Sequence, residues 1–121
     1  MKKILIVDDR IEIRELVNVT LKGEDYEILE TKTGQEAIEI TKKEKPDLII
    51  MDIMMPGEIN GLEATRILKN SPETKSCKIV MLSAKGQKID IEKGFEAGAD
   101  DYFIKPFAPL ELIEKVEAIL G

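Results

Sequence analysis

The stretch Leu48-Ile49-Ile50-Met51-Asp52 places four consecutive apolar residues directly before a carboxylate. Such a run is typical of a strand covered on both faces, as in a parallel sheet flanked by helices. A similar run, Ile4-Leu5-Ile6-Val7, precedes two carboxylates, Asp8 and Asp9. Because parallel strands end at the same edge of a sheet, the two runs predict a crevice lined by acidic side chains.

Apolar runs recur along the rest of the chain, and segments with helical periodicity separate them. The five predicted strands are Ile4–Val7, Tyr26–Leu29, Leu48–Met51, Ile79–Leu82 and Tyr102–Ile104. Four of them are nearly continuous in apolar residues and are expected to be covered on both faces. Tyr26–Leu29 alternates and is expected at a sheet edge. Between the strands, apolar residues recur every three to four positions, and Gly or Pro residues mark the connections.

This alternation predicts one α/β domain over residues 1–121, with no output domain. We expect a flavodoxin-like, doubly wound (βα)5 fold with helices on both faces of a five-stranded parallel sheet. The expected strand order is 2-1-3-4-5, which places a ligand crevice at the carboxyl ends of the strands. A chain of 121 residues holds one such core and not two.

Composition excludes several classes of function. A net charge of −6 argues against direct binding of nucleic acid, and the longest apolar runs are far too short for a membrane span. The single cysteine, Cys77, cannot form an internal disulfide and favours a cytoplasmic protein. The chain contains no histidine, which excludes imidazole-based catalysis and the usual zinc sites.

The predicted strand ends carry the polar residues Asp8, Asp9, Asp52, Ser83 and Lys105. Taken singly, each has an ordinary interpretation; Asp8 or Asp9, for example, is a candidate cap for a helix beginning at Arg10. Taken together, three converging carboxylates require a counter-charge. Lys105 supplies one, and an all-oxygen site selects Mg²⁺, for which Mn²⁺ is a substitute. The set therefore predicts a metal-assisted site for phosphoryl transfer to an aspartate.

The chain resembles the receiver domains of two-component response regulators, the CheY-like superfamily, over its whole length. The motifs that carry this resemblance are Ile4–Asp9, Leu48–Pro56, Ser83-Ala84 and Gly98–Phe107. It implies that Asp52 is the phosphoacceptor and that Ser83 and Lys105 contact the phosphoryl group. It also implies that Mg²⁺ is bound by Asp9, Asp52 and the Met54 carbonyl, with Asp8 helping through water. Tyr102 matches the aromatic switch residue, and the peptide bond Lys105–Pro106 is expected to be cis.

By the same resemblance, the chain is a signalling switch and not a conventional enzyme. It is expected to accept a phosphoryl group from a sensor histidine kinase or a histidine phosphotransfer protein. Phosphorylation would then change the surface formed by the fourth helix, fifth strand and fifth helix. This surface is expected to bind an unknown downstream protein. We expect a monomer or a phosphorylation-dependent dimer, with no nucleic acid or membrane as a partner.

Some features depart from the family pattern or leave alternatives open. The loop 56–61 is one residue longer than is common in the family, and the resemblance implies that Met54 and Lys85 occupy positions that tune the lifetime of the acyl phosphate. Alternatives are a Mg²⁺-dependent phosphatase with an aspartyl-phosphate intermediate, a flavodoxin-like cofactor binder, and a receiver-like module that is not phosphorylated. Gly94 and Gly98 are expected to reflect close helix packing and a helix C-cap.

Overall fold

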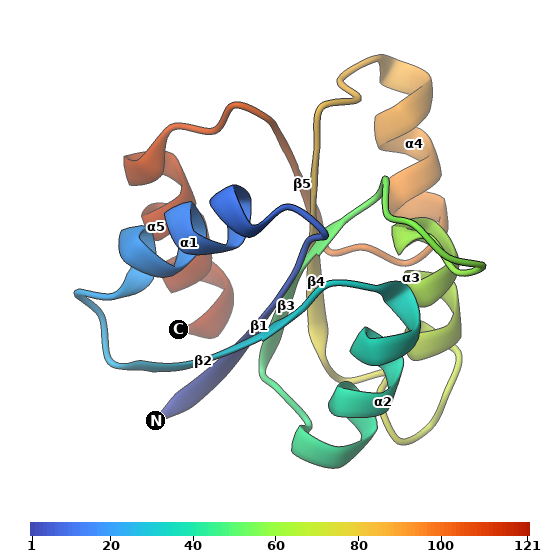
Figure 1. The fold of residues 1–121 in the computed structure, drawn as a ribbon, viewed down its shortest axis with the longest axis horizontal. Coiled ribbons are helices and arrows are strands. Elements are labelled where there is room, and N and C mark those ends of the chain that lie inside the picture. Colours follow the sequence, from blue (N-terminus) through green and yellow to red (C-terminus); the bar gives the residue numbers. More distant parts are fainter.

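Five strands and five helices alternate along the chain in a computed structural model that describes residues 1–121 (Figure 1). The strands are β1 (Lys2–Val7), β2 (Tyr26–Thr31), β3 (Leu48–Asp52), β4 (Lys78–Ser83) and β5 (Asp101–Ile104). The helices are α1 (Ile11–Leu21), α2 (Gly34–Glu44), α3 (Gly61–Lys69), α4 (Lys88–Glu96) and α5 (Pro109–Leu120). None of these helices is long and apolar enough to cross a membrane.

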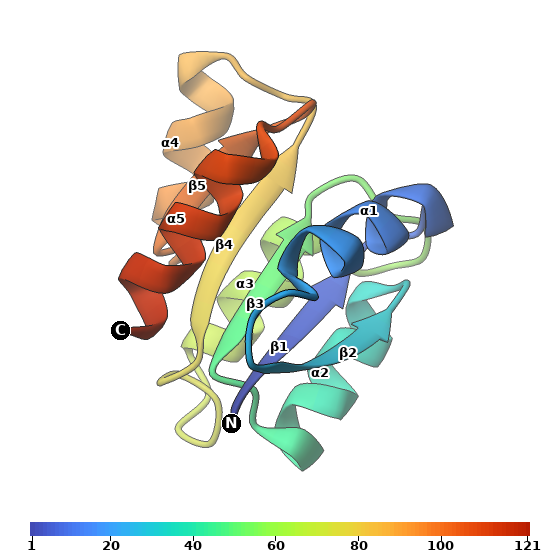
Figure 2. The same cartoon turned by 90° about the vertical axis from the view of Figure 1, so that its left-hand side faces the viewer.

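The strands form one parallel sheet in the order β2-β1-β3-β4-β5, which confirms the predicted fold class. The arrows of neighbouring strands point the same way in Figure 2, so the strands share one carboxyl edge. The strand order reverses beside β1, where the chain runs outward to β2 and then back to β3. This switch point is where the topology leaves a crevice for a ligand.

Two hydrophobic cores lie on opposite faces of the sheet. Helices α1 and α5 cover one face and helices α2, α3 and α4 cover the other (Figure 1). Successive residues of one strand contribute to different cores, as Leu5 and Ile6 of β1 do. This division explains the continuous apolar runs, because a strand buried on both faces has no position left for a solvent-exposed side chain.

The two edge strands differ in how well the sequence predicted them. Strand β2 lies at one edge and is only partly buried, as its alternating pattern predicted. Strand β5 was expected to be covered on both faces, and it is covered only in part: Tyr102 packs against one core and Phe103 against the other. Its position at the opposite edge agrees with the predicted strand order, but all four of its residues retain some exposure, and Ile104 is 44% exposed. A short apolar edge strand cannot be distinguished from a central one by periodicity alone.

Some helix ends follow the expected turn chemistry and others do not. The Asn60 side chain caps α3 by accepting a hydrogen bond from the backbone N–H of Glu63 at 2.9 Å. Gly98 follows α4 with φ of 111°, the left-handed conformation that favours glycine after a helix. The N-cap of α1 is Arg10 and not Asp8 or Asp9, and neither Arg10 nor Ala108, the N-cap of α5, provides a side-chain cap.

Candidate functional site

Three carboxylates meet at the carboxyl edge of the sheet. Asp8 and Asp9 follow β1, and Asp52 is the last residue of β3. One oxygen from each carboxylate lies within 4.8 Å of the other two. Asp8 and Asp52 are 1% and 4% exposed, whereas Asp9 faces solvent. The structure therefore brings together the acidic residues that the sequence predicted, with one open side.

Lys105 is the cation of the cluster. It follows β5, and its ammonium group lies 2.8 Å from Asp8 Oδ2 and 3.2 Å from Asp52 Oδ1. The lysine side chain is 13% exposed, so its charge is partly desolvated and shared between two buried acids. Residues separated by 97 and 53 positions in the sequence are thus joined in one charge network.

The position of Asp8 is fixed by its backbone and side-chain partners. Its Oδ1 atom accepts a hydrogen bond from the backbone N–H of Arg10 at 2.9 Å. Its carbonyl oxygen accepts one from Arg14 Nη1 at 2.7 Å, and the same arginine pairs with Glu30 at 3.1 Å. The sequence analysis did not identify this contact of Arg14 with Asp8, because an arginine in a helix usually lies on the solvent-exposed face.

Burial and the neighbouring charge of Asp8 raise the pKa of Asp52 from 3.8 to about 6. Lys105 opposes this rise without cancelling it. The cluster therefore holds more negative charge than one lysine neutralises, as the sequence predicted. Acidic oxygen donors in a partly open site suit a hard divalent cation such as Mg²⁺. The residues present fit that ion.

An open hollow lies beside the acidic cluster on the side of Asp9. Its lining includes Asp9, Met54 and Glu58, and the Met54 side chain is 61% exposed. Met54 therefore shares this hollow with Asp9. Met54 follows the last residue of β3, Asp52, by two positions. Its backbone carbonyl therefore lies in the loop between β3 and α3.

Gly61 was not predicted as a site residue, yet it lies against the backbone of Asp52. A Cβ atom at this position would overlap with the carbonyl group of Asp52. The backbone N–H of Gly61 also donates to the Ile53 carbonyl at 3.0 Å. The pair Asn60-Gly61 was a visible turn signal, but only the folded chain shows that this glycine lets α3 begin beside Asp52.

Ser83 lies at the end of β4, next to the lysine. Its carbonyl oxygen accepts a hydrogen bond from the backbone N–H of Lys105 at 2.8 Å, and its side chain is fully buried. Its hydroxyl accepts one from the backbone N–H of Lys85 at 3.1 Å. The peptide bond Lys105–Pro106 is cis, as expected. Ser83 therefore connects the site to the β4–α4 loop.

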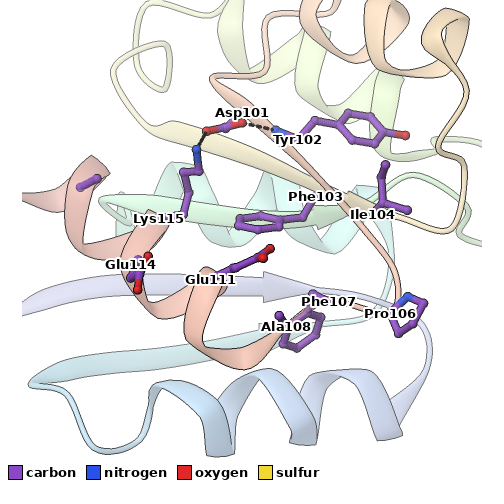
Figure 3. A pocket seen from close by; sticks show the side chains of 11 residues that line it. Asp101, Tyr102, Phe103, Ile104, Pro106, Phe107, Ala108, Glu111, Glu114 and Lys115 are labelled. Atoms are coloured by element: carbon purple, nitrogen blue, oxygen red, sulfur yellow. Dashed lines mark hydrogen bonds and ion pairs between the residues drawn. The ribbon is translucent and has the colours of Figure 1, made fainter.

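Tyr102 also contacts this loop. Its hydroxyl donates a hydrogen bond to the Lys85 carbonyl at 2.6 Å, and burial raises its pKa above 10.0. Figure 3 shows Tyr102 and Ile104 on one side of β5, while Phe103 points the other way, toward the groove between β5 and α5. The tyrosine ring thus turns away from that groove.

Comparisons with known proteins agree with this geometry. The family model of the response regulator receiver domain matches residues 4–117. The chain is 45% identical over 119 residues to the phosphate regulon transcriptional regulatory protein PhoB of Pseudomonas aeruginosa, covering 98% of this chain and 52% of that protein. It is 45% identical over 118 residues to the transcriptional regulatory protein ResD of Bacillus subtilis, covering 98% of this chain and 48% of that one.

A solved structure is similar over its full length. The chemotaxis response regulator CheY4 of Vibrio cholerae aligns with a TM-score of 0.90 and 32% identity, covering 98% of both chains. By contrast, this chain spans about half the length of the two transcriptional regulators. The similarity therefore covers about half of each of those regulators.

Proposed function

This chain belongs to the response regulator receiver family, whose members are phosphorylatable switches of two-component systems, and on that premise we propose that Asp52 is its phosphoacceptor. One observation carries the assignment. Lys105 contacts both Asp8 and Asp52 at the switch point of the sheet, so one cation serves two buried acids. Residues 1–121 then make up one receiver domain, which acts as a signalling switch and not as a conventional enzyme.

The chemistry assigned to Asp52 is nucleophilic attack on phosphorus. Its Oδ1 atom is paired with Lys105, which leaves Oδ2 as the attacking oxygen. A new oxygen–phosphorus bond forms while the bond from phosphorus to the donor's imidazole nitrogen breaks, and that nitrogen leaves with the electron pair. Lys105 stabilises the negative charge that develops on the phosphoryl oxygens. We assign the Ser83 hydroxyl as the hydrogen-bond donor to the phosphoryl group on Asp52.

Mg²⁺ would be held by Asp9, Asp52 and the Met54 carbonyl, with Asp8 acting through water. When bound, the ion supplies positive charge that offsets both the acidic cluster and the incoming phosphoryl group. Support for this assignment comes from the three clustered carboxylates and from the raised pKa of Asp52. The exposure of Asp9 keeps one side of the cluster open to a phosphodonor.

The phosphodonor is proposed to be a sensor histidine kinase or a histidine phosphotransfer protein. The chain contains no histidine of its own, so phosphohistidine must come from another protein. The phosphatase alternative is not favoured, because such enzymes usually carry a second acid where this chain has Met54. We assign the output to an unidentified protein that binds the surface around α4, β5 and α5.

The test is the intact mass of the chain after treatment with acetyl phosphate, with and without Mg²⁺. We expect a gain of one phosphoryl group that requires Mg²⁺ and disappears in Asp52→Asn. The matched control is Asp25→Asn, which removes an exposed carboxylate away from the site and should label like the parent. Phosphate that still attaches to Asp52→Asn at another residue would overturn the assignment.

A further inference from the structure

Gly94 lies in the middle of α4 and directly faces the ring of Tyr102. A Cβ atom at this position would lie 2.9 Å from Tyr102 Cδ2 and 3.1 Å from Cε2. Real Cβ atoms essentially never approach another heavy atom within 3.0 Å. The tyrosine ring therefore occupies space that exists only because residue 94 has no side chain.

The backbone of Gly94 gives no other reason for a glycine. Its φ lies outside the left-handed region, so an alanine would adopt the same conformation without strain. Glycine inside a helix is less favourable than alanine, and α4 is only nine residues long. The contact with Tyr102 accounts for a residue that otherwise weakens this helix.

The ring position matters because its hydroxyl is bound to the loop that follows β4. Tyr102 donates to the Lys85 carbonyl at 2.6 Å, and the Lys85 N–H donates to the Ser83 hydroxyl at 3.1 Å. Moving the ring outward would break the first of these bonds and release the loop that carries the second. The position of one aromatic ring is therefore linked to the geometry of Ser83.

We propose that Gly94 is a positioning residue: it leaves space for the Tyr102 ring between α4 and β5, and it thereby holds the β4–α4 loop against Ser83. Any side chain at position 94 displaces the ring toward solvent. This space for the ring is a property of the fold, whereas its importance for signalling rests on the proposed function of Asp52. Gly94 acts through Tyr102 and does not touch the reacting atoms.

The test compares Gly94→Ala with Gly23→Ala in a Tyr26→Phe background. The chain has two tyrosines and no tryptophan, so Tyr102 is then the only strong fluorophore. Gly23 is the matched control, because a Cβ there meets nothing within 4 Å. We measure acrylamide quenching of tyrosine fluorescence, the tyrosine pKa by absorbance titration, and amide hydrogen exchange at Lys85.

Gly94→Ala is expected to raise the quenching constant toward that of free tyrosine and to lower the tyrosine pKa toward 10.0. Exchange at the Lys85 amide should become faster, because its loop loses the hydrogen bond from Tyr102. Gly23→Ala should match the parent in all three measurements. A folded Gly94→Ala chain with parent-like quenching, pKa and exchange would refute the proposal.

A second comparison covers the case in which Gly94→Ala does not fold. The double variant Gly94→Ala/Tyr102→Ala removes the ring that the new methyl group would strike. If that contact is the reason for the glycine, the double variant folds; if it fails to fold as well, the proposal is wrong. None of these measurements uses a phosphodonor. A failed phosphorylation of Asp52 therefore leaves their outcome intact, and the reverse also holds.

Discussion

Replacing the proposed phosphoacceptor should make the metal-free chain more stable. Asp52 is 4% exposed, adjoins the Asp8 carboxylate, and has its pKa raised from 3.8 to about 6. A pKa raised in the folded state means that folding disfavours the ionised form. At pH 7.5 the carboxylate is ionised in both states, so its charge destabilises the fold. Asp52→Asn removes that charge and keeps the size of the side chain.

The pKa values give the magnitude of the effect. Each pKa unit corresponds to about 1.4 kcal/mol, so the ionised Asp52 costs the folded chain up to about 3 kcal/mol. We expect Asp52→Asn to raise the free energy of unfolding by about 1 to 3 kcal/mol at pH 7.5, since the amide also gives up its ion pair with Lys105. The difference should fall to about half by pH 5, because the folded parent takes up a proton between pH 6 and 4.

The assay is urea denaturation followed by circular dichroism, in EDTA, at pH 7.5 and pH 5. With a slope of about 2 kcal/mol per molar urea, the midpoint should rise by roughly 1 M at pH 7.5. Asp25→Asn serves as the exposed control and should leave the midpoint unchanged. An Asp52→Asn chain that is less stable than the parent at pH 7.5 would refute the reasoning, because the ionised Asp52 carboxylate would then stabilise the folded chain.

Three further predictions concern the same site. Lys105→Met should lower the free energy of unfolding by about 3 kcal/mol at pH 7.5 in urea denaturation, because Asp8 and Asp52 lose their shared counter-charge; an unchanged midpoint would contradict this. Mg²⁺ at about 100 times its dissociation constant should raise the parent's stability by about 2.7 kcal/mol. The gain should be smaller in Asp52→Asn, and equal gains would argue against this metal site. Gly61→Ala should slow acetyl phosphate labelling and cost about 1 to 3 kcal/mol, since its Cβ overlaps with the Asp52 backbone, whereas Gly23→Ala should not.

The sequence predicted the strand ends and the acidic cluster for the same physical reason. A strand buried on both faces must be apolar throughout, so its end is marked by the first polar residue, as Met51-Asp52 shows. Parallel topology then brings such ends together whatever their separation in the sequence. The pairing of Lys105 with Asp8 follows from this rule, although 97 positions separate them.

Residues that act through packing were not predictable in this way. Gly61 and Gly94 have no side chain, and close packing was expected only at Gly94. Which backbone or ring approaches each glycine is known only from the folded chain. The exposure of strand β5 was underestimated, because it is decided by the edge position of the strand and by how much of it α4 and α5 cover. Periodicity describes one element at a time, whereas these features depend on the distance between two elements.

The site and the tyrosine are connected by a continuous series of contacts. Asp52 pairs with Lys105, whose backbone N–H donates to Ser83; Ser83 binds Lys85, and Lys85 binds Tyr102. Such a series transmits a signal only if one of its members has two positions of similar free energy, because a ligand shifts an equilibrium only through the difference in its contacts with the two states. The ring of Tyr102 is the member with room to move, since it lies at the edge strand beside solvent. In the proposed mechanism, a side chain at position 94 would occupy the inward position of the ring, and a charge change at Asp52 would then have no equilibrium of the ring to shift. On this proposal, the absence of a side chain at Gly94 is what gives the Tyr102 ring its inward position.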